Sequence, residues 1–205
     1  MNQRLVIAID GPSASGKGTL ARRLAAHFGL PHLDTGLLYR AVGWAADRTG
    51  RDPAEVAALL TAYNLENPEL RSDEASQLGS RAAAIPLVRA NLLKFQKEFS
   101  SQGQGAVLDG RDIGTVICPD APVKIFVTAA PEVRASRRAL EFSTQGQAVD
   151  EATVLADILA RDKRDTTRKV APLKQAADAH LLDTTDMNID AAFRAAVELV
   201  EKSRR

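Results

Sequence analysis

The sequence predicts an α/β fold, in which a parallel sheet is flanked by helices. Three observations support this fold class. Residues 5–9 are a continuous apolar run that stops at Asp10-Gly11-Pro12, as expected for a strand buried on both faces. Residues 17–28 then carry apolar side chains at helical spacing. Further strand and helix patterns alternate along the chain with short links, which is typical of a parallel sheet.

In the first half, we expect a strand at residues 5–9 and a helix at 17–28, which Gly29 ends. A short second strand at 31–33 and a helix at 35–46 follow. Residues 49–76 have the weakest pattern, and only a short helix at 53–60 is expected there. A long helix is expected from about residue 74 to residue 100, with Pro86 as the point where it can break.

In the second half, we expect strands at residues 106–108, 123–127 and 179–182. Pro131 is expected to open a helix, because proline at the first helical position loses no hydrogen bond. Residues 142–150 are interpreted as a polar connection with its tip at Gln145-Gly146-Gln147. Helices are expected at 151–164 and 188–202.

Composition narrows the classes of function. A chain of 205 residues suits one domain, and a formal net charge of +1 argues against a general binder of nucleic acid or of membrane surfaces. No apolar stretch is long enough to span a bilayer, and Cys118 is the only cysteine, which fits a reducing compartment. We therefore expect a cytoplasmic monomer with neither nucleic-acid nor membrane partners.

The strongest chemical signal is a phosphate-binding loop between the first strand and the first helix. Its spacing is G-x-x-x-x-G-K, and its backbone N–H groups and the helix N-terminus are suited to cradle phosphate oxygens, while the lysine reaches the β and γ phosphates. The loop residues are Gly11, Pro12, Ser13, Ala14, Ser15, Gly16, Lys17, Gly18 and Thr19. Gly18 replaces the usual serine or threonine, so we expect Mg²⁺ to be held through ATP phosphates and water, with no direct protein ligand.

Polar segments follow the second and third strands, where open α/β sheets bind ligands. Residues 34–40 offer an aromatic ring, a hydroxyl and a guanidinium, although Tyr39 as a core residue and Arg40 as a surface charge remain an alternative. Residues 109–112 place two acids beside Arg111. The charge run at 161–168 fits either a solvated helix end, with pairs such as Arg161 and Asp165, or arginines that bind phosphate oxygens.

These segments resemble the bacterial cytidylate kinases over nearly the whole chain. The matching blocks are Asp34-Thr35-Gly36 with Tyr39-Arg40, then D-G-R-D-I-G-T-V from Asp109, then R-D-x-R-D-x-x-R from Arg161, and finally Ala171-Pro172-Leu173. The resemblance implies a P-loop NTPase-type sheet that transfers the γ-phosphoryl group of ATP to CMP or dCMP. Thr35 stands where the family more often has serine, a change that keeps the hydroxyl.

The resemblance also implies roles for individual residues. Arg40, Arg89, Arg111 and Arg168 would hold the acceptor phosphate. Ser80, Asp112, Arg161 and Asp165 would contact cytosine and the sugar, and Asp34, Thr35 and Tyr39 would complete the acceptor site. Arg137 and Arg138 would close over ATP. The catalytic set would be Lys17, Arg111, Arg161 and Arg168.

The implied organisation is a single nucleoside monophosphate kinase domain over residues 1–205. Its core would be 1–34 and 102–205, its acceptor-binding segment about 35–95, and its lid about 142–168. Bacterial members often carry a longer insertion between the Arg40 and Arg89 helices, and this chain is expected to lack the small extra sheet there.

Several alternatives stay open from the sequence. The acceptor can be UMP, AMP or a non-nucleotide metabolite instead. A nucleotide-dependent switch is a further class, although the N-K-x-D motif that reads guanine is missing. We expect direct attack by an acceptor phosphate oxygen without an enzyme nucleophile. Either Asp109 or Asp112 can hold a metal-bound water or orient an arginine.

Overall fold

The structure is a computed structural model that describes residues 4–61, 65–144, 146 and 149–204. The chain forms two compact units. Unit 1 comprises Met1–His32 and Gly103–Arg205, and unit 2 comprises Leu33–Gln102. Among the described residues, no helix combines the length and apolar character needed to cross a bilayer.

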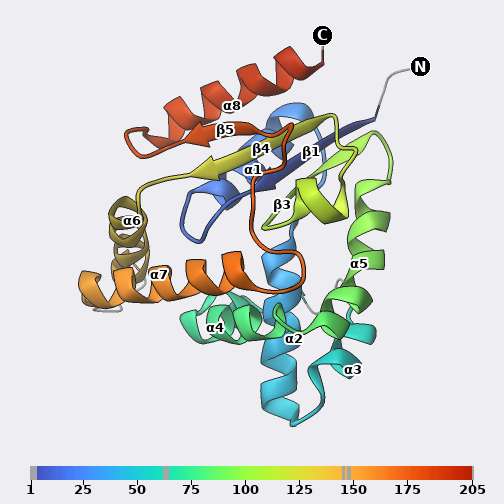
Figure 1. The fold of residues 1–205 in the computed structure, drawn as a ribbon, viewed down its shortest axis with the longest axis vertical. Coiled ribbons are helices and arrows are strands. Elements are labelled where there is room, and N and C mark those ends of the chain that lie inside the picture. Colours follow the sequence, from blue (N-terminus) through green and yellow to red (C-terminus); the bar gives the residue numbers. More distant parts are fainter. Residues whose placement is uncertain (1–3, 62–64, 145, 147–148, 205) are drawn as a thin grey trace. The chain divides into compact units, whose positions relative to one another are not determined.

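The strands form one five-stranded sheet with the order β2-β3-β1-β4-β5 (Figure 1). Its strands are β1 (Leu5–Asp10), β2 (His32–Asp34), β3 (Gly105–Gly110), β4 (Val123–Thr128) and β5 (His180–Asp183). β1 pairs in parallel with β3 and β4, and β4 pairs in parallel with β5. The predicted fold class, a parallel sheet flanked by helices, is confirmed.

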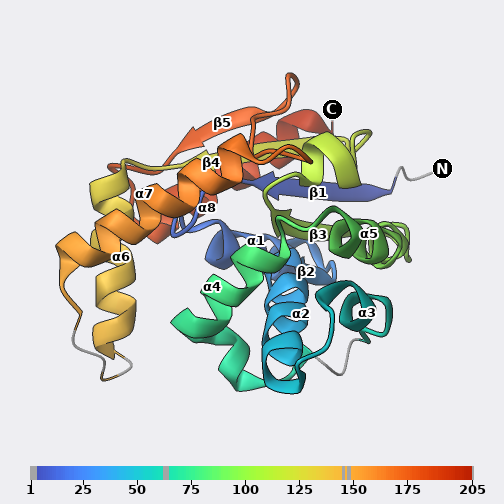
Figure 2. The ribbon, with the colours of Figure 1, turned by 60° about the horizontal axis from the view of Figure 1, so that its bottom comes forward.

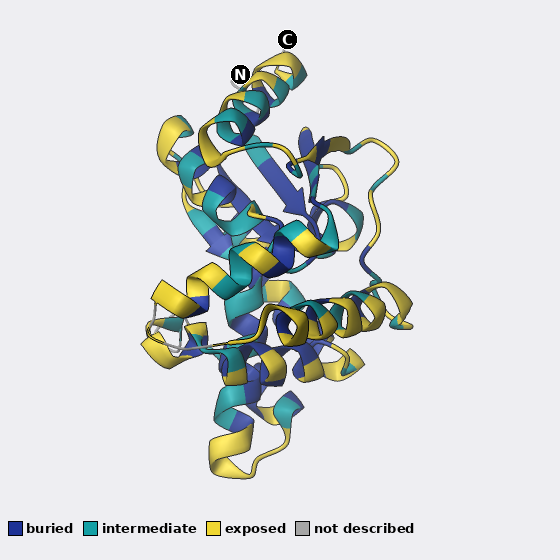
Figure 3. Cartoon of the chain, turned by 90° about the vertical axis from the view of Figure 1, so that its left-hand side faces the viewer, coloured by how far each residue is buried: buried dark blue, intermediate teal, exposed yellow. Residues whose placement is uncertain are grey.

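One face of the sheet packs on α1 (Lys17–Phe28) and α8 (Ile189–Ser203). Alternate strand residues such as Ile7 and Ile9 point to this face, and Leu20 and Leu24 meet them from α1 at helical spacing. All four side chains are almost completely buried, and burial stabilises the fold by about 1.5–3 kcal/mol for each such side chain. In Figure 3 most of β1, β3 and β4 has the colour of buried residues.

Two further helices of unit 1, α6 (Pro131–Thr144) and α7 (Glu151–Thr167), pack against each other. Phe142 is buried with Ala135, Val154 and Ile158 between them. The prediction that the polar connection begins at residue 142 was therefore wrong, because the aromatic ring at the end of α6 belongs to this apolar contact. Gln145 and Gln147 of the predicted tip lie outside the described residues.

A π-helical turn, η3 (Ile113–Ile117), follows β3 and was not predicted. It packs on β1 and β3, and Ile113 and Ile117 are buried. Local periodicity gives no signal for a single turn of this kind. Its first two N–H groups donate hydrogen bonds to Asp10 of β1, as described below.

Unit 2 is built from helices (Figure 2). They are α2 (Thr35–Thr49), α3 (Pro53–Ala58), the 3₁₀ turn η2 (Pro68–Arg71), α4 (Asp73–Ala82) and α5 (Pro86–Ser100). The long helix expected from about residue 74 to residue 100 is two helices, because Pro86 opens α5. Ser72 caps α4 by accepting a hydrogen bond from the Ala75 N–H.

Helices α2 and α4 approach each other closely at two glycines. A Cβ on Gly43 would lie 2.6 Å from the main-chain carbonyl of Leu78, and one on Gly79 would lie 2.9 Å from the Arg40 Cα. The described residues between α2 and α5 include no strand, in line with the expectation that the small extra sheet is lacking.

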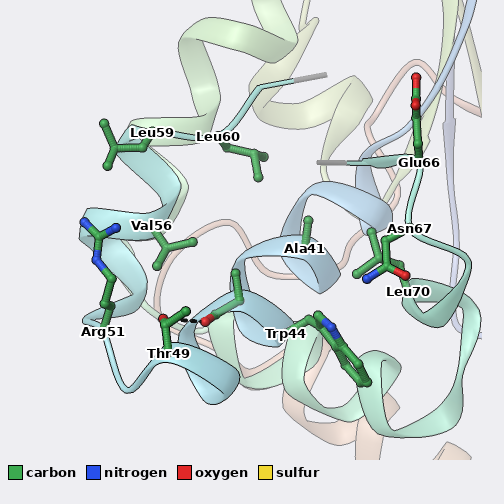
Figure 4. A pocket seen from close by; sticks show the side chains of 11 residues that line it. Ala41, Trp44, Thr49, Arg51, Val56, Leu59, Leu60, Glu66, Asn67 and Leu70 are labelled. Atoms are coloured by element: carbon green, nitrogen blue, oxygen red, sulfur yellow. Dashed lines mark hydrogen bonds between the residues drawn. The ribbon is translucent and has the colours of Figure 1, made fainter. Parts of the chain in front are cut away.

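A cavity of about 490 Å³ lies in unit 2 on another face of α2 (Figure 4). Ala41, Trp44, Leu59, Leu60 and Leu70 form much of its apolar lining. None of the predicted site residues lines this cavity.

Candidate functional site

The phosphate loop connects β1 to α1 and contains three residues in the left-handed or positive-φ region. A Cβ on Gly11, which has φ +156°, would lie 2.0 Å from the Val127 carbonyl oxygen. Gly16 caps α1 at φ +84°, and Ala14 adopts φ +58°, a conformation that costs free energy for a residue with a Cβ. The loop conformation thus needs support from the surrounding chain.

That support comes from side chains that donate to loop carbonyls. Arg134 Nη1 donates to the Ser13 carbonyl at 3.2 Å, and Thr184 Oγ1 lies within donor distance of two carbonyls, that of Ser15 at 3.3 Å and that of Thr128 at 3.0 Å. Lys17 Nζ donates to the Pro12 carbonyl at 3.2 Å, so it lies folded over the loop. Ser15 Oγ is buried and has no hydrogen-bond partner among the described residues.

Arg134 was missed in the sequence because an arginine in a helix usually reads as a surface charge. Its side chain is only 4% exposed. Besides the Ser13 carbonyl it reaches the Ala129 carbonyl at 2.9 Å and the Asp162 carboxylate at 2.7 Å. Arg134 therefore links the phosphate loop to α7.

Arg137 and Arg138, the residues expected to close over ATP, have partners in unit 1. Arg137 donates to Thr184 Oγ1 at 3.1 Å and to the Thr184 carbonyl at 2.7 Å. Arg138 pairs with Glu141 at 2.8 Å and lies over the Phe142 ring at 4.4 Å. In this structure Arg137 thus anchors the loop after β5, and Arg138 packs along its own helix.

Two carboxylates lie at the ends of the central strands. Asp109, at the end of β3, forms a hydrogen bond of 2.7 Å between its Oδ1 and His32 Nε2. Its other oxygen, Oδ2, would be 3.7 Å from a Cβ on Gly18, so it faces the first turn of α1. Sequence reasoning missed the contact with His32, because the two residues are far apart in the chain.

Asp10, at the end of β1, was also missed. Its Oδ1 accepts a hydrogen bond from the Ile113 N–H and its Oδ2 accepts one from the Gly114 N–H, both at 2.8 Å. Burial raises the pKa of Asp10 to about 6, although the two N–H bonds and Arg111 oppose the rise, while Asp112 adds to it.

Four predicted acceptor-site residues come together in unit 1. Arg111 Nε donates to Asp165 Oδ2 at 2.8 Å, and Arg168 Nη2 lies 3.6 Å from Asp112 Oδ1. Asp112 and Asp165 are buried. The charge run on α7 is therefore not a wholly solvated helix end.

The charges of this cluster stabilise one another. Burial pushes the pKa of Asp165 upward, but Arg111, Arg161 and Arg168 together outweigh it, so the pKa lies below its ordinary value. Burial likewise disfavours the charged form of Arg111, and the nearby acids, Asp165 foremost, hold its pKa above the ordinary value. Both groups are thus charged at neutral pH.

The segment after α7 folds back on this cluster. Arg168 Nε donates to the Ala171 carbonyl at 2.7 Å, and the Leu173 N–H donates to the Asp165 carbonyl at 2.7 Å. The Ala171-Pro172-Leu173 motif thus satisfies a carbonyl at the helix C-terminus and fixes the guanidinium of Arg168.

Arg161, a fifth predicted acceptor-site residue, lies on α7 in unit 1, and the remaining ones belong to unit 2. The Arg89 guanidinium lies 5.3 Å from the centroid of the Tyr39 ring and donates to the Ala83 carbonyl at 3.3 Å. Arg40 donates to the Leu70 carbonyl at 3.2 Å. Ser80 Oγ is buried and lacks a hydrogen-bond partner in the described part of the chain. Asp34 immediately precedes α2, and Thr35 is buried at its first position.

Within the described ranges, no group of three histidine, cysteine, aspartate or glutamate side chains has the arrangement of a metal site. Asp109 is the carboxylate that faces the start of α1, whereas Asp112 lies beside Arg168.

Comparison with known proteins gives a consistent result. A family model described as cytidylate kinase matches residues 7–202. The chain is 57% identical over 206 residues to the cytidylate kinase of Bradyrhizobium sp. (strain ORS 278), with 98% of this chain and 97% of the relative covered. It is 57% identical over 198 residues to the cytidylate kinase of Cereibacter sphaeroides, with 97% and 96% covered. Such nearly complete alignments leave no room for a long insertion in these relatives.

Solved structures share the fold at low sequence identity. An uncharacterized protein from Eubacterium ventriosum matches with a TM-score of 0.60 at 18% identity, over 98% of this chain and 99% of the other. A gluconokinase from Sinorhizobium meliloti matches with a TM-score of 0.54 at 14% identity, over 98% and 94%. These likenesses support the fold alone.

Proposed function

The chain belongs to the cytidylate kinase family, and on this premise we propose that it transfers the γ-phosphoryl group of ATP to CMP or dCMP, giving CDP or dCDP and ADP. The observation that carries the proposal is the buried cluster of Arg111, Asp112, Asp165 and Arg168 in the unit that holds the phosphate loop. A nucleotide switch has no need for a second set of buried arginines and carboxylates.

The donor is bound by the phosphate loop. Loop N–H groups and the N-terminus of α1 complement the phosphate charge, and Lys17 leaves the Pro12 carbonyl to reach the β and γ phosphates. The buried Ser15 Oγ, which lacks a hydrogen-bond partner among the described residues, is a further polar atom in this loop. Arg137 and Arg138 close over the bound ATP in this proposal.

The acceptor phosphate is bound by guanidinium groups, Arg111 and Arg168 from unit 1 and Arg40 and Arg89 from unit 2. Arginine suits this role because its planar donor fork matches phosphate oxygens. Arg111 uses Nε for Asp165 and Nη1 for the Gly110 carbonyl, so Nη2 remains for the acceptor.

Cytosine is distinguished from uracil by its exocyclic amino group, which donates where uracil has a carbonyl. Asp112 and Asp165 are the carboxylates that accept from this amino group or from sugar hydroxyls. Arg161, Ser80, Asp34, Thr35 and Tyr39 complete the acceptor contacts. The depressed pKa of Asp165 keeps it an acceptor at neutral pH.

In the transfer step, an oxygen of the acceptor phosphate attacks the γ-phosphorus of ATP, and the bond to the β–γ bridging oxygen breaks. The bonding electrons remain with ADP, and no enzyme nucleophile takes part. Lys17, the loop N–H groups, Arg111, Arg161 and Arg168 stabilise the charge of the transferring group.

Mg²⁺, when bound, would neutralise charge on the ATP phosphates. The chain fits a metal held by phosphates and water, with Asp109 positioned to accept a hydrogen bond from such a water. We further propose a monomeric, cytoplasmic enzyme whose partners are its nucleotide substrates.

The test is ADP release measured with ATP and Mg²⁺ against CMP, dCMP, UMP, AMP and GMP, one at a time. Turnover on CMP or dCMP far above the other acceptors supports the proposal. Preferred turnover on another acceptor would retain the fold and the phosphate loop but overturn the assignment of the base. Slow hydrolysis that ignores every acceptor would favour the switch.

A further inference from the structure

Asp10 connects the phosphate loop of unit 1 with the turn η3. It is the last residue of β1, and Gly11, the first residue of the phosphate loop, follows it directly. Its carboxylate reaches across the sheet to the start of η3, where it accepts hydrogen bonds from the Ile113 and Gly114 N–H groups. Both bonds are 2.8 Å long, and Asp10 is 5% exposed.

The two bonds fix the main chain directly after Arg111 and Asp112. Arg111 and Asp112 follow β3 directly. Arg111 pairs with Asp165 of α7, and Asp112 lies near Arg168, the residue that ends this helix. A shift of residues 113 and 114 would therefore displace Arg111 and Asp112, which both contact the acceptor in the proposed function. The segment is tightly packed, because a Cβ on Gly114 would lie 3.4 Å from Asp10 Oδ2 and 3.2 Å from Lys124 Cδ.

A carboxylate is the side chain that this arrangement requires. Each of its two oxygens accepts from one N–H, whereas an asparagine would place an NH₂ group against one of those N–H donors. This arrangement buries a charge, and burial raises the pKa of Asp10 to about 6. A side chain that served packing alone would not need this charge.

We propose that Asp10 is a positioning residue for the acceptor: it holds the start of η3 so that Arg111 and Asp112 are oriented toward the acceptor nucleotide, at a fixed place relative to the phosphate loop. The inference rests on the proposed function and adds to it a residue that touches neither nucleotide.

The test compares Asp10→Asn with the wild-type enzyme. Asparagine keeps the size of the side chain but leaves one buried N–H without an acceptor. We expect the KM for CMP to rise by about fivefold or more, since an unsatisfied buried group shifts a local equilibrium by at least that factor. We expect the KM for ATP to change by less than about threefold, because the loop carbonyls keep their own donors, Arg134 and Thr184.

Gly114→Ala provides a second variant that leaves the charge in place. Its added methyl group would lie 3.2 Å from Lys124 Cδ and 3.4 Å from Asp10 Oδ2, so it crowds the turn that Asp10 holds, and we expect the same change in the KM for CMP with a smaller amplitude. Asp178→Asn is the matched control. It also removes a carboxylate that accepts a hydrogen bond, from Lys124 at 2.7 Å, but its side chain is 67% exposed, and both KM values should remain at wild-type levels.

A rise in the KM for CMP in both variants, with the KM for ATP nearly unchanged, supports the positioning role. Equal losses for CMP and ATP, or a lower melting temperature with wild-type KM values, would show that Asp10 serves the fold alone. Should Asp10→Asn fail to fold, Gly114→Ala decides by the same criterion. If the wild-type enzyme does not phosphorylate CMP, the proposed function fails instead, and binding of CMP alone to the wild type and to Gly114→Ala still tests Asp10.

Discussion

Arg111 and Asp165, which are 54 positions apart in the sequence, form a hydrogen-bonded ion pair of 2.8 Å between the end of β3 and helix α7. The two side chains are only 15% and 7% exposed. The pair holds the carboxylate and the guanidinium that are proposed to contact the base and the phosphate of one acceptor. Loss of either partner thus affects both contacts.

Arg111→Ala should weaken acceptor binding far more than ATP binding. It removes a phosphate contact and leaves the Asp165 charge buried, so stability should also fall by about 3 kcal/mol or more. Titration calorimetry with CMP and with a non-hydrolysable ATP analogue, alongside urea unfolding, checks both effects. Equal weakening of the two nucleotides would contradict the assignment of Arg111.

Lys17→Ala should lower kcat by about two to four orders of magnitude, because the lysine neutralises charge on the transferring group. Its ammonium group donates to the Pro12 carbonyl in a contact that is only partly buried, so the melting temperature should change little. Single-turnover rates and thermal unfolding measure the two quantities. Near-normal turnover would remove Lys17 from the mechanism.

The pair of Arg134 and Asp162 should be strongly coupled, because the contact is 2.7 Å long and the two side chains are only 4% and 21% exposed. Arg134→Lys retains the charge but cannot reach the three acceptors at once, and we expect the KM for ATP to rise as the Ser13 carbonyl is released. A double-mutant cycle with Asp162→Asn should give a coupling energy of about 1 kcal/mol or more. Additive effects would show that Arg134 and Asp162 have no coupling free energy, and would contradict a stabilising link between the phosphate loop and α7.

Asp10 should make stability depend on pH between about 4 and 6. Its pKa is raised from 3.8 to about 6, so in this window the folded state binds more protons than the unfolded state, and the free energy of unfolding falls as pH rises. The fall should total about 3 kcal/mol at most, as the raised pKa implies. Urea unfolding of the wild type and Asp10→Asn at several pH values measures it as the difference between their slopes. Parallel pH profiles would contradict the burial of an ionised Asp10.

Gly43→Ala should destabilise unit 2, because the added methyl group would lie 2.6 Å from the Leu78 carbonyl and force α2 away from α4. A cost of about 1–3 kcal/mol is expected for overpacking of this kind. Gly29→Ala is the comparison, since nothing lies within 4 Å of that position and only its φ of +65° opposes the change. Thermal unfolding should rank Gly43→Ala as the more harmful variant.

The elements of the fold with a strong local period were predictable. The apolar run of β1, the helical spacing of α1 and the Pro86 break all depend on neighbouring residues, and the structure contains all three. Residues 142–144 were misjudged because the helical state of Phe142 depends on packing against Val154 and Ile158 of α7. The turn η3 was missed for a similar reason, because its start is held by Asp10 from another strand.

The candidate site divides in the same way. Lys17 was named as a candidate from motif spacing, and Arg40, Arg89, Arg111 and Arg168 were named from the family resemblance. His32, Asp10 and Arg134 act through contacts with Asp109, with the η3 main chain and with the Ser13 carbonyl. No local pattern reports such contacts, because each joins segments that are remote in sequence.

The most direct test of the central claim is the ratio of kcat/KM for CMP to that for UMP in the wild type and in Asp165→Asn. Asparagine can still accept from Arg111 Nε, but it weakens the contact proposed for the cytosine amino group. We predict a wild-type ratio of about 100 or more, reduced at least about tenfold by the substitution, as the loss of one charged hydrogen bond implies. A wild-type enzyme without preference for CMP, or an unchanged ratio in Asp165→Asn, would contradict the account.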